Sequence, residues 1–118
     1  MAQPASIQIG NAQADAAMRG WFVGHFLDDS AGLRRTDDVE IKWAHHEAGE
    51  TRSEWATNET RSTIAILISG THEVQFREQT VRLARPGDYV MWGEGTDHRW
   101  RAIDDCTVLV VRWPSIST

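Results

Sequence analysis

The sequence is poor in cysteine, lysine and tyrosine, and it has no long apolar run. Cys106 is the only cysteine in 118 residues, so no intramolecular disulfide stabilises the fold, and we expect a packed thiol in an apolar strand. No stretch of about eighteen apolar residues is found, which excludes a membrane-spanning helix. The length suffices for one domain and is too short for two ordinary ones.

Positive charge is also scarce relative to negative charge. Twelve basic residues, eleven arginines and one lysine, stand against seventeen acidic ones, and the net charge is −5. Because the basic residues are interspersed with acids, we expect no general binding to nucleic acid or to an anionic membrane. Residues 1–4 lack the charged region and the apolar core of a secretory signal, so a cytoplasmic location is expected.

Tryptophan is the abundant aromatic residue, with six copies against one tyrosine and three phenylalanines. A tryptophan ring offers a large apolar face and one N–H donor, which suits a core or a ligand-lined cavity equally well. Core packing is the more common fate of any single tryptophan. Five of them fall in or beside the strands predicted below: Trp43, Trp55, Trp92, Trp100 and Trp113.

Residues 12–27 form the only convincing helical candidate. Four alanines favour a helix in its first half, and the second half is densely apolar. Gly20 and Gly24 weaken the pattern, so the alternative for the second half is an irregular or extended segment. We therefore expect residues 1–38 to form an N-terminal helical or irregular segment that packs on the rest of the chain or on a partner.

From residue 39 onward the pattern is that of short β-strands. Residues 39–46 alternate, which predicts a half-buried strand, whereas the apolar run 63–68 predicts a strand buried on both faces. Polar residues 47–54 predict a loop. Further strands are expected at 72–77, 80–84, 89–92, 98–103 and 107–113. Many short strands separated by turn signals predict an antiparallel barrel or sandwich over residues 39–114, followed by a tail at 115–118.

The segment Pro86–His98 carries the most specific motif. A proline–glycine turn opens it, an apolar strand follows, and Gly93 and Gly95 allow a second turn before the histidine. This spacing resembles the second conserved motif of the cupin superfamily, in which Gly87, Gly95 and His98 occupy the positions of two glycines and a metal-ligand histidine. Gly93 stands where proline is usual in the motif, and Ala102 stands where asparagine is usual.

The resemblance to cupins extends over roughly residues 39–113, and it includes a buried strand that ends at Gly70, as the first cupin motif does. It implies a jelly-roll barrel with one open mouth, in which His98 points inward to the place where metal and substrate meet in cupins. The predicted fold class is therefore all-β, an antiparallel cupin-like jelly-roll β-barrel with a short N-terminal helical segment.

The metal ligands of the first cupin motif are missing at their expected spacing. The motif places two histidines and a glutamate ahead of its glycine, and counting back from Gly70 puts Thr63 in the glutamate position. The histidine pair falls on Thr57 and Glu59, or on the residues immediately before them. Since a mononuclear site needs about three converging protein ligands, we predict no strong metal site and no cofactor. A divalent metal is the less favoured alternative.

Strand parity predicts which side chains face the barrel interior. In the strand that follows the motif, alternate residues from position 98 face inward, and Arg99 and Arg101 face outward. In strand 39–46 the apolar set is expected to face inward. The predicted inward side chains are Ile41, Trp43, His45, His98 and Trp100.

For the histidines outside the motif, the sequence allows different predictions of position and role. His45 would approach His98 from the opposing strand and rebuild part of a metal site. A ligand-contacting or internally hydrogen-bonded imidazole is the favoured reading for His45. His46 has the opposite parity and is expected in solvent, and His72, which begins a strand beside a turn, is expected at the rim or surface.

These patterns favour a cupin-like protein that binds a small organic ligand in a barrel pocket lined by tryptophan and histidine, without a strong metal site. The alternative is a small cupin enzyme, metal-dependent or acid–base, that acts on a carbohydrate or carboxylate metabolite. The sequence leaves its catalytic residues open. The predicted ligand-binding residues are Trp43, His45, Trp55, Glu59, Trp92, His98 and Trp100.

The expected partners are the small ligand and, as one of two alternatives, a second copy of the chain. Trp21, Phe22 and Phe26 form an apolar group in the N-terminal segment. They either pack across a homodimer partner or cover the barrel of their own chain.

Overall fold

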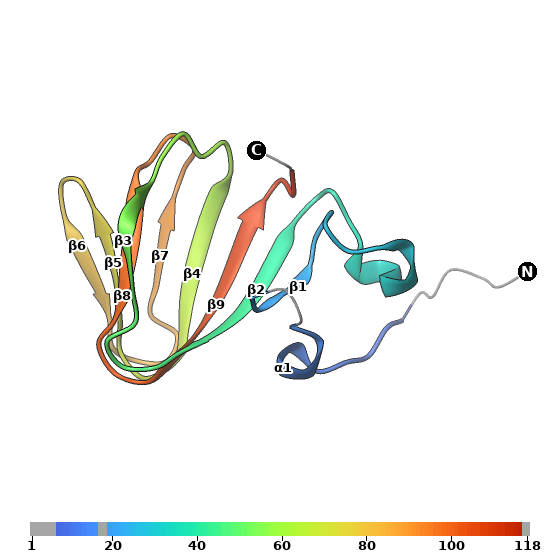
Figure 1. Ribbon diagram of the computed structural model, residues 1–118, viewed down its shortest axis with the longest axis horizontal. Coiled ribbons are helices and arrows are strands. Elements are labelled where there is room, and N and C mark those ends of the chain that lie inside the picture. Colours follow the sequence, from blue (N-terminus) through green and yellow to red (C-terminus); the bar gives the residue numbers. More distant parts are fainter. Residues whose placement is uncertain (1–6, 17–18, 117–118) are drawn as a thin grey trace, which may run out of the picture.

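Two antiparallel β-sheets make up most of the molecule, in a computed structural model that describes residues 7–16 and 19–116 (Figure 1). One sheet has the strand order β1-β2-β9-β4-β7, and the other has the order β3-β8-β5-β6. The strands are β1 (Trp21–Val23), β2 (Glu40–His46), β3 (Thr51–Ala56), β4 (Ser62–Ser69), β5 (His72–Phe76), β6 (Thr80–Leu83), β7 (Tyr89–Trp92), β8 (His98–Ala102) and β9 (Cys106–Trp113). The strand pairs are antiparallel, so the all-β prediction is confirmed.

The connectivity interleaves strands from distant parts of the chain. β9 lies between β2 and β4, and β8 lies between β3 and β5. Such crossing between two sheets is the arrangement of a jelly roll, which leaves the inner faces of both sheets opposed. Side chains of both sheets therefore meet in one interior space, and the site described below lies there.

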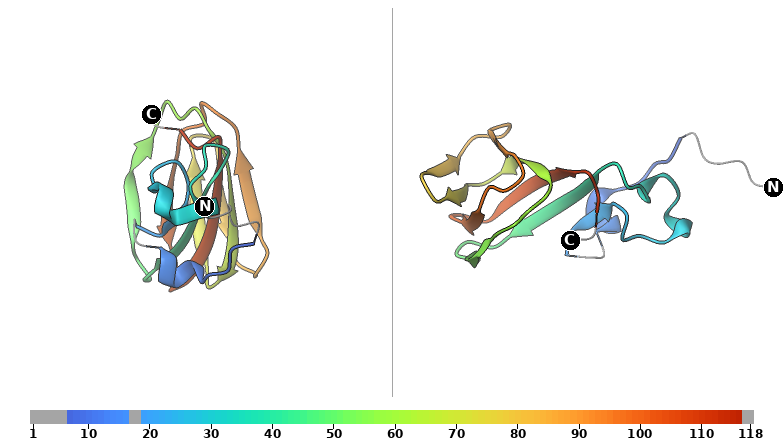
Figure 2. Two further views of the ribbon diagram at one scale, coloured as in Figure 1. Left: turned by 90° about the vertical axis from the view of Figure 1, so that its right-hand side faces the viewer. Right: turned by 90° about the horizontal axis from the view of Figure 1, so that it is seen from above.

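The N-terminal segment differs from the helix predicted at residues 12–27. Helix α1 covers only Ala12–Asp15, and β1 pairs with β2 instead of continuing a helix. Gly20 and Gly24 have φ angles of +96° and +155°, which interrupt a helix, so the extended alternative holds for the second half. Residues 17 and 18 of the prediction lie outside the described residues. A short 3₁₀ helix, Asp29–Arg34, follows, and the segment sits at one end of the sandwich (Figure 2).

Strand β3 was missed because its sequence does not alternate. Residues 51–54 are exposed, although they belong to an edge strand that pairs with β8. A polar edge strand gives no period-two signal, and the sequence therefore predicted a loop at residues 47–54.

A small apolar core lies deep between the sheets. Leu67 of β4 is fully buried, and Leu83, Ala102 and Val108 are each 1% exposed. Cys106 belongs to the same cluster, and burial raises the pKa of its thiol, as expected for a packed, unreactive cysteine.

The first sheet is apolar on its outer face as well. Two rows cross the strands in register, one formed by Ile41, Val111, Ile64 and Met91 and the other by Trp43, Leu109, Ile66 and Tyr89. Met91 and Tyr89 are 53% and 62% exposed. The prediction that strand 63–68 is buried on both faces is therefore wrong for the outer face of β4.

The predicted inward face of β2 is also wrong. Lys42, Ala44 and His46 face the interior, so Ile41, Trp43 and His45 face outward, and His45 is exposed. The alternation along β2 is correct, but its apolar residues belong to the outer rows. The inner face of this sheet is polar at several positions, so apolar character does not mark it. In the part of the chain that the structure describes, no helix is long and apolar enough to cross a bilayer.

Candidate functional site

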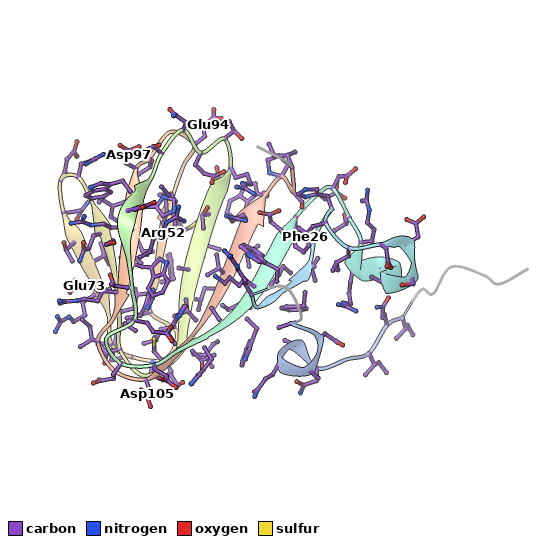
Figure 3. The ribbon with its side chains drawn as sticks, viewed as in Figure 1. Phe26, Arg52, Glu73, Glu94, Asp97 and Asp105 are labelled. Carbon is purple, nitrogen blue, oxygen red and sulfur yellow. The ribbon has the colours of Figure 1, made fainter. Side chains whose placement is uncertain are left out.

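A cavity of about 100 Å³ lies between the inner faces of the two sheets. Its walls combine aromatic rings, three imidazoles and three basic side chains, and Arg52 of β3 points into the space between the sheets (Figure 3). Among the described residues that line it, none is acidic. The lining residues are Trp21, Lys42, Ala44, His46, Arg52, Thr63, Ala65, His72, Val74, Trp92, His98, Trp100, Val108, Val110 and Arg112.

His98 stands at the start of β8 and faces this cavity, as strand parity predicts. Its ring lies 4.7 Å from the ring of Trp92, which comes from β7 in the other sheet. Nδ1 of His98 lies 3.1 Å from the carbonyl oxygen of Thr96. Because a carbonyl only accepts, this bond places the proton on Nδ1 and leaves Nε2 as an acceptor. Burial lowers the pKa of His98, so the imidazole is neutral at neutral pH.

Trp100 follows on the same inner face, while Arg99 lies on the outer face. The Nε group of Arg99 donates to Gln75 Oε1 at 2.7 Å, and its Nη1 donates to the carbonyl of Ser53 at 3.2 Å. The predicted orientation of this strand is therefore correct. Ligand binding by Trp92, His98 and Trp100 stays a prediction.

Two further imidazoles lie against Trp100 inside the cavity, that of His72 stacked and that of His46 tilted, and sequence reasoning placed both of them elsewhere. The ring of His46 lies 4.2 Å from that of Trp100, and the ring of His72 lies 5.6 Å from it. His72 is only 4% exposed, and burial lowers its pKa to about 4. The expectations of a solvated His46 and a surface His72 are wrong, because β2 faces the opposite way and β5 begins in the interior.

His46 and His72 have different surroundings at their Nδ1 atoms. His46 Nδ1 lies 2.9 Å from Oε2 of the exposed residue Glu50, whereas His72 Nδ1 lies 3.5 Å from the Cys106 sulfur in the core. Burial also lowers the pKa of His46 despite the carboxylate. Both imidazoles are thus neutral at neutral pH.

Trp43 and His45, predicted as ligand contacts, lie outside the cavity. His45 Nδ1 is 3.2 Å from the hydroxyl oxygen of Thr107, on the outer side of β2, and Trp43 belongs to an outer apolar row. His45 therefore does not approach His98 across the barrel.

Trp55 and Glu59 are also absent from the cavity wall. The guanidinium carbons of Arg77 and Arg99 lie 4.1 and 4.3 Å from the centroid of the Trp55 ring. Glu59 accepts from Arg61 at 2.5 and 2.9 Å. Each side chain has a structural role that the strand and motif patterns do not reveal.

A cluster of ion pairs around Glu40 adjoins the cavity through Arg112, which also lines the cavity wall. Glu40 is fully buried and accepts from Arg61 Nη1 at 2.5 Å, from Arg112, and from the Ser115 hydroxyl at 2.9 Å. His25 Nδ1 lies 2.7 Å from the same hydroxyl oxygen. We call these five residues the Glu40 cluster. It joins β2, β9, the start of β4 and the N-terminal segment.

The residues present do not fit the metal that the cupin motif implies. Among the described residues, no three His, Cys, Asp or Glu side chains converge to hold a metal ion. The motif position that usually supplies a glutamate holds Thr63, and Lys42, Arg52 and Arg112 bring positive charge to the same wall. A divalent cation would meet repulsion there, because these charges are close and partly desolvated.

A larger hollow of about 530 Å³ lies between the β5–β6 turn and the β7–β8 turn and shares Trp92 with the inter-sheet cavity. Its wall combines apolar residues such as Val81 and Val90 with the exposed polar side chains of Arg77, Glu78 and Gln79. The inter-sheet cavity is the stronger candidate, because it is lined by convergent aromatic and titratable groups from both sheets.

Several solved structures with a similar arrangement are named as cupin proteins. The chain is similar to KdgF from Halomonas sp., with 24% identity and a TM-score of 0.60 over 67% of this chain and 72% of that one. It is also similar to a cupin-2 domain containing protein from Shewanella frigidimarina, with 20% identity and a TM-score of 0.55 over 67% of this chain and 74% of that one. A third similar structure is DMSP lyase DddQ from Ruegeria pomeroyi, with 22% identity and a TM-score of 0.61 over 70% of this chain and 42% of that one. No protein-family model and no curated protein sequence matches the chain.

These likenesses agree with the resemblance of the Pro86–His98 motif and with the two interleaved sheets. At such identities they concern the fold alone. The chain therefore has the jelly-roll fold of the cupin proteins.

Proposed function

We propose that this protein binds a small organic ligand in the inter-sheet cavity, without the help of a metal ion. The observation that carries the proposal is that His46, His72 and His98 line the same cavity as Trp92 and Trp100. Aromatic faces with a few oriented polar groups are the usual composition of a ligand site. A cytoplasmic location remains part of this proposal.

The size of the cavity limits the ligand. A volume of about 100 Å³ is well below the roughly 300–1,000 Å³ of pockets that hold drug-sized molecules. The proposed ligand is therefore a small metabolite or a small end of a larger one that enters through the barrel mouth.

Binding can be tested by the thermal unfolding of the protein with a library of small metabolites. A ligand that binds the folded state raises the unfolding temperature. We expect Trp100→Ala to abolish the increase and Trp43→Ala, on the outer face, to preserve it. If both variants respond like the original protein, the ligand does not occupy the cavity.

A second candidate function is acid–base catalysis in the same cavity, and the protonation state of His98 favours it. A neutral imidazole with its Nδ1 proton held by Thr96 has a free basic nitrogen, which is what a general base needs. One similar protein is called a lyase, DMSP lyase DddQ. Catalysis predicts that His98→Gln abolishes turnover of the bound ligand while its binding remains. Turnover that survives this change would contradict the role of His98.

Homodimerisation through the N-terminal segment stays a proposal that the contacts within the chain do not favour. The Trp21 ring packs edge-on against Phe26 at 6.0 Å and lies 4.1 Å from the guanidinium carbon of Arg112. These contacts support the alternative in which the segment covers its own barrel. Analytical ultracentrifugation of the protein would decide between the two.

A further inference from the structure

Three buried polar atoms in the cavity wall have no hydrogen-bond partner among the described residues. They are the hydroxyl of Thr63, the indole nitrogen of Trp92 and Nε of Arg112. Buried polar atoms are usually satisfied, so three unsatisfied atoms in one wall require an explanation.

These three residues form one row across the first sheet. Thr63 on β4 is paired directly with Trp92 on β7 and with Arg112 on β9. Side chains that are directly opposite in neighbouring strands lie on the same face, and all three line the cavity. A short side chain thus stands between two long ones.

The chemistry of the row selects an acceptor. An indole N–H and an arginine Nε–H only donate, and a threonine hydroxyl is able to donate as well. A carboxylate is an acceptor-only group with two oxygens, and it would satisfy such donors. An amine or ammonium group would leave the two N–H groups unsatisfied.

The charges around the row favour an anion. Lys42 and Arg52 line the cavity beside Arg112. Glu40 and Glu59 offset the charges of Arg112 and Arg61, but none of the described acidic residues lines the cavity to offset Lys42 and Arg52. The pKa of Lys42 is lowered by burial and by the nearby charges of Arg112, Arg19 and Arg52. The cavity wall therefore has an excess of positive charge that an anion would offset.

We infer that Thr63, Trp92 and Arg112 form a carboxylate-binding row, and that the ligand of the cavity is a small carboxylate. This inference rests on the proposed function and names its ligand class. Thr63 is 2% exposed, so its hydroxyl is held in place before a ligand enters. In the position where the cupin motif usually has a metal-binding glutamate, this chain instead has a donor for an anion.

The test follows the indole N–H signal of Trp92 by NMR during titration with sodium acetate at constant ionic strength. Trp92→Phe identifies this signal by its loss. Acetamide, a neutral molecule of nearly the same shape, serves as the matched ligand control. The imidazole signals of His46 and His98 are recorded at the same time as reporters of any cavity ligand.

We expect acetate to shift the Trp92 signal in a saturable way and acetamide to bind much more weakly. Thr63→Val should weaken acetate binding about tenfold, the scale of one lost hydrogen bond to a charged group. Thr63→Ser, which keeps the hydroxyl, should retain most of the affinity. The exposed control Thr60→Val should have no effect.

The contrary outcomes distinguish this inference from the proposed function. If acetamide binds as tightly as acetate, or if Thr63→Val leaves acetate binding unchanged, the carboxylate-binding row is refuted while the cavity remains a ligand site. If neither probe and no neutral metabolite shifts the Trp92, His46 or His98 signals, the proposed function fails as well.

Discussion

At the scale of single residues, burial determines the charge state of the imidazoles that line the cavity. Burial lowers the pKa of each of the imidazoles that line it, and that of His72 falls from 6.5 to about 4. The sequence identified His98 from its glycine spacing, but it gave no signal for His46 or His72. Both are found only through the pairing of β2 with β9 and of β5 with β8, which no local pattern records.

The low pKa of His72 predicts a loss of stability in acid. Below a pH of about 6.5 the unfolded chain takes up a proton on this imidazole, whereas the folded chain resists protonation until about pH 4. The free energy of unfolding therefore falls as the pH decreases through this window, by about 3 kcal/mol for a shift of this size.

Urea unfolding at several pH values measures this effect. Between neutral pH and about pH 4, we expect the free energy of unfolding to decrease by about 3 kcal/mol less in His72→Gln than in the unchanged protein. His45→Gln, at an exposed position, should follow the original curve. If the free energy of unfolding changes with pH in the same way in His72→Gln and in the unchanged protein, the lowered pKa of His72 is not the cause of the loss of stability in acid.

At the scale of the elements, the contrast between β8 and β2 shows what the sequence can predict. β8 places two arginines on one face, so its inward side was evident. β2 alternates equally well, but Ile41 and Trp43 belong to the outer apolar rows and Lys42 and His46 face the cavity. Hydrophobic periodicity shows which residues share a face, and it identifies the interior only where the interior is apolar. Hydrophobic periodicity therefore gave the wrong inward face for β2, whose polar side chains line the cavity for which ligand binding is proposed.

The turn after β4 provides a stability test at this scale. Gly70 has a φ of +81°, and an added Cβ would lie 2.1 Å from the carbonyl oxygen of Asp105. Gly87 has a φ of +94° but no atom within 4 Å of an added Cβ. Gly87→Ala should therefore cost only the backbone term of about 1–2 kcal/mol, and Gly70→Ala clearly more. Equal losses in urea unfolding would show that the close contact at Gly70 is not rigid.

At the scale of the whole molecule, the Glu40 cluster connects the cavity wall, through Arg112, to the N-terminal segment, through His25. Glu40 is fully buried beside Arg61 and Arg112. Removing one partner of a buried ion pair leaves an uncompensated charge and costs about 3–5 kcal/mol. Sequence reasoning assigned Glu59 to a degenerate metal motif and overlooked Glu40, since ion pairs between distant strands leave no mark on local spacing.

We predict that Glu40→Gln lowers the free energy of unfolding by about 3–5 kcal/mol. Glu54→Gln, at an exposed position of β3, should change it by less than about 0.5 kcal/mol. Urea or thermal unfolding of the two variants measures the difference. Similar small losses in both would show that the cluster contributes little to holding the barrel together.

The central claim is that a small ligand occupies the cavity between the sheets, and the five imidazoles of the chain report on it directly. Their C–H signals, assigned through single His→Gln variants, are recorded by NMR before and after addition of a ligand found by thermal unfolding. The account predicts shifts at His98 and His46, which line the cavity, and none at His45, which faces outward. A ligand that shifts His45 and leaves His98 and His46 unchanged would contradict it.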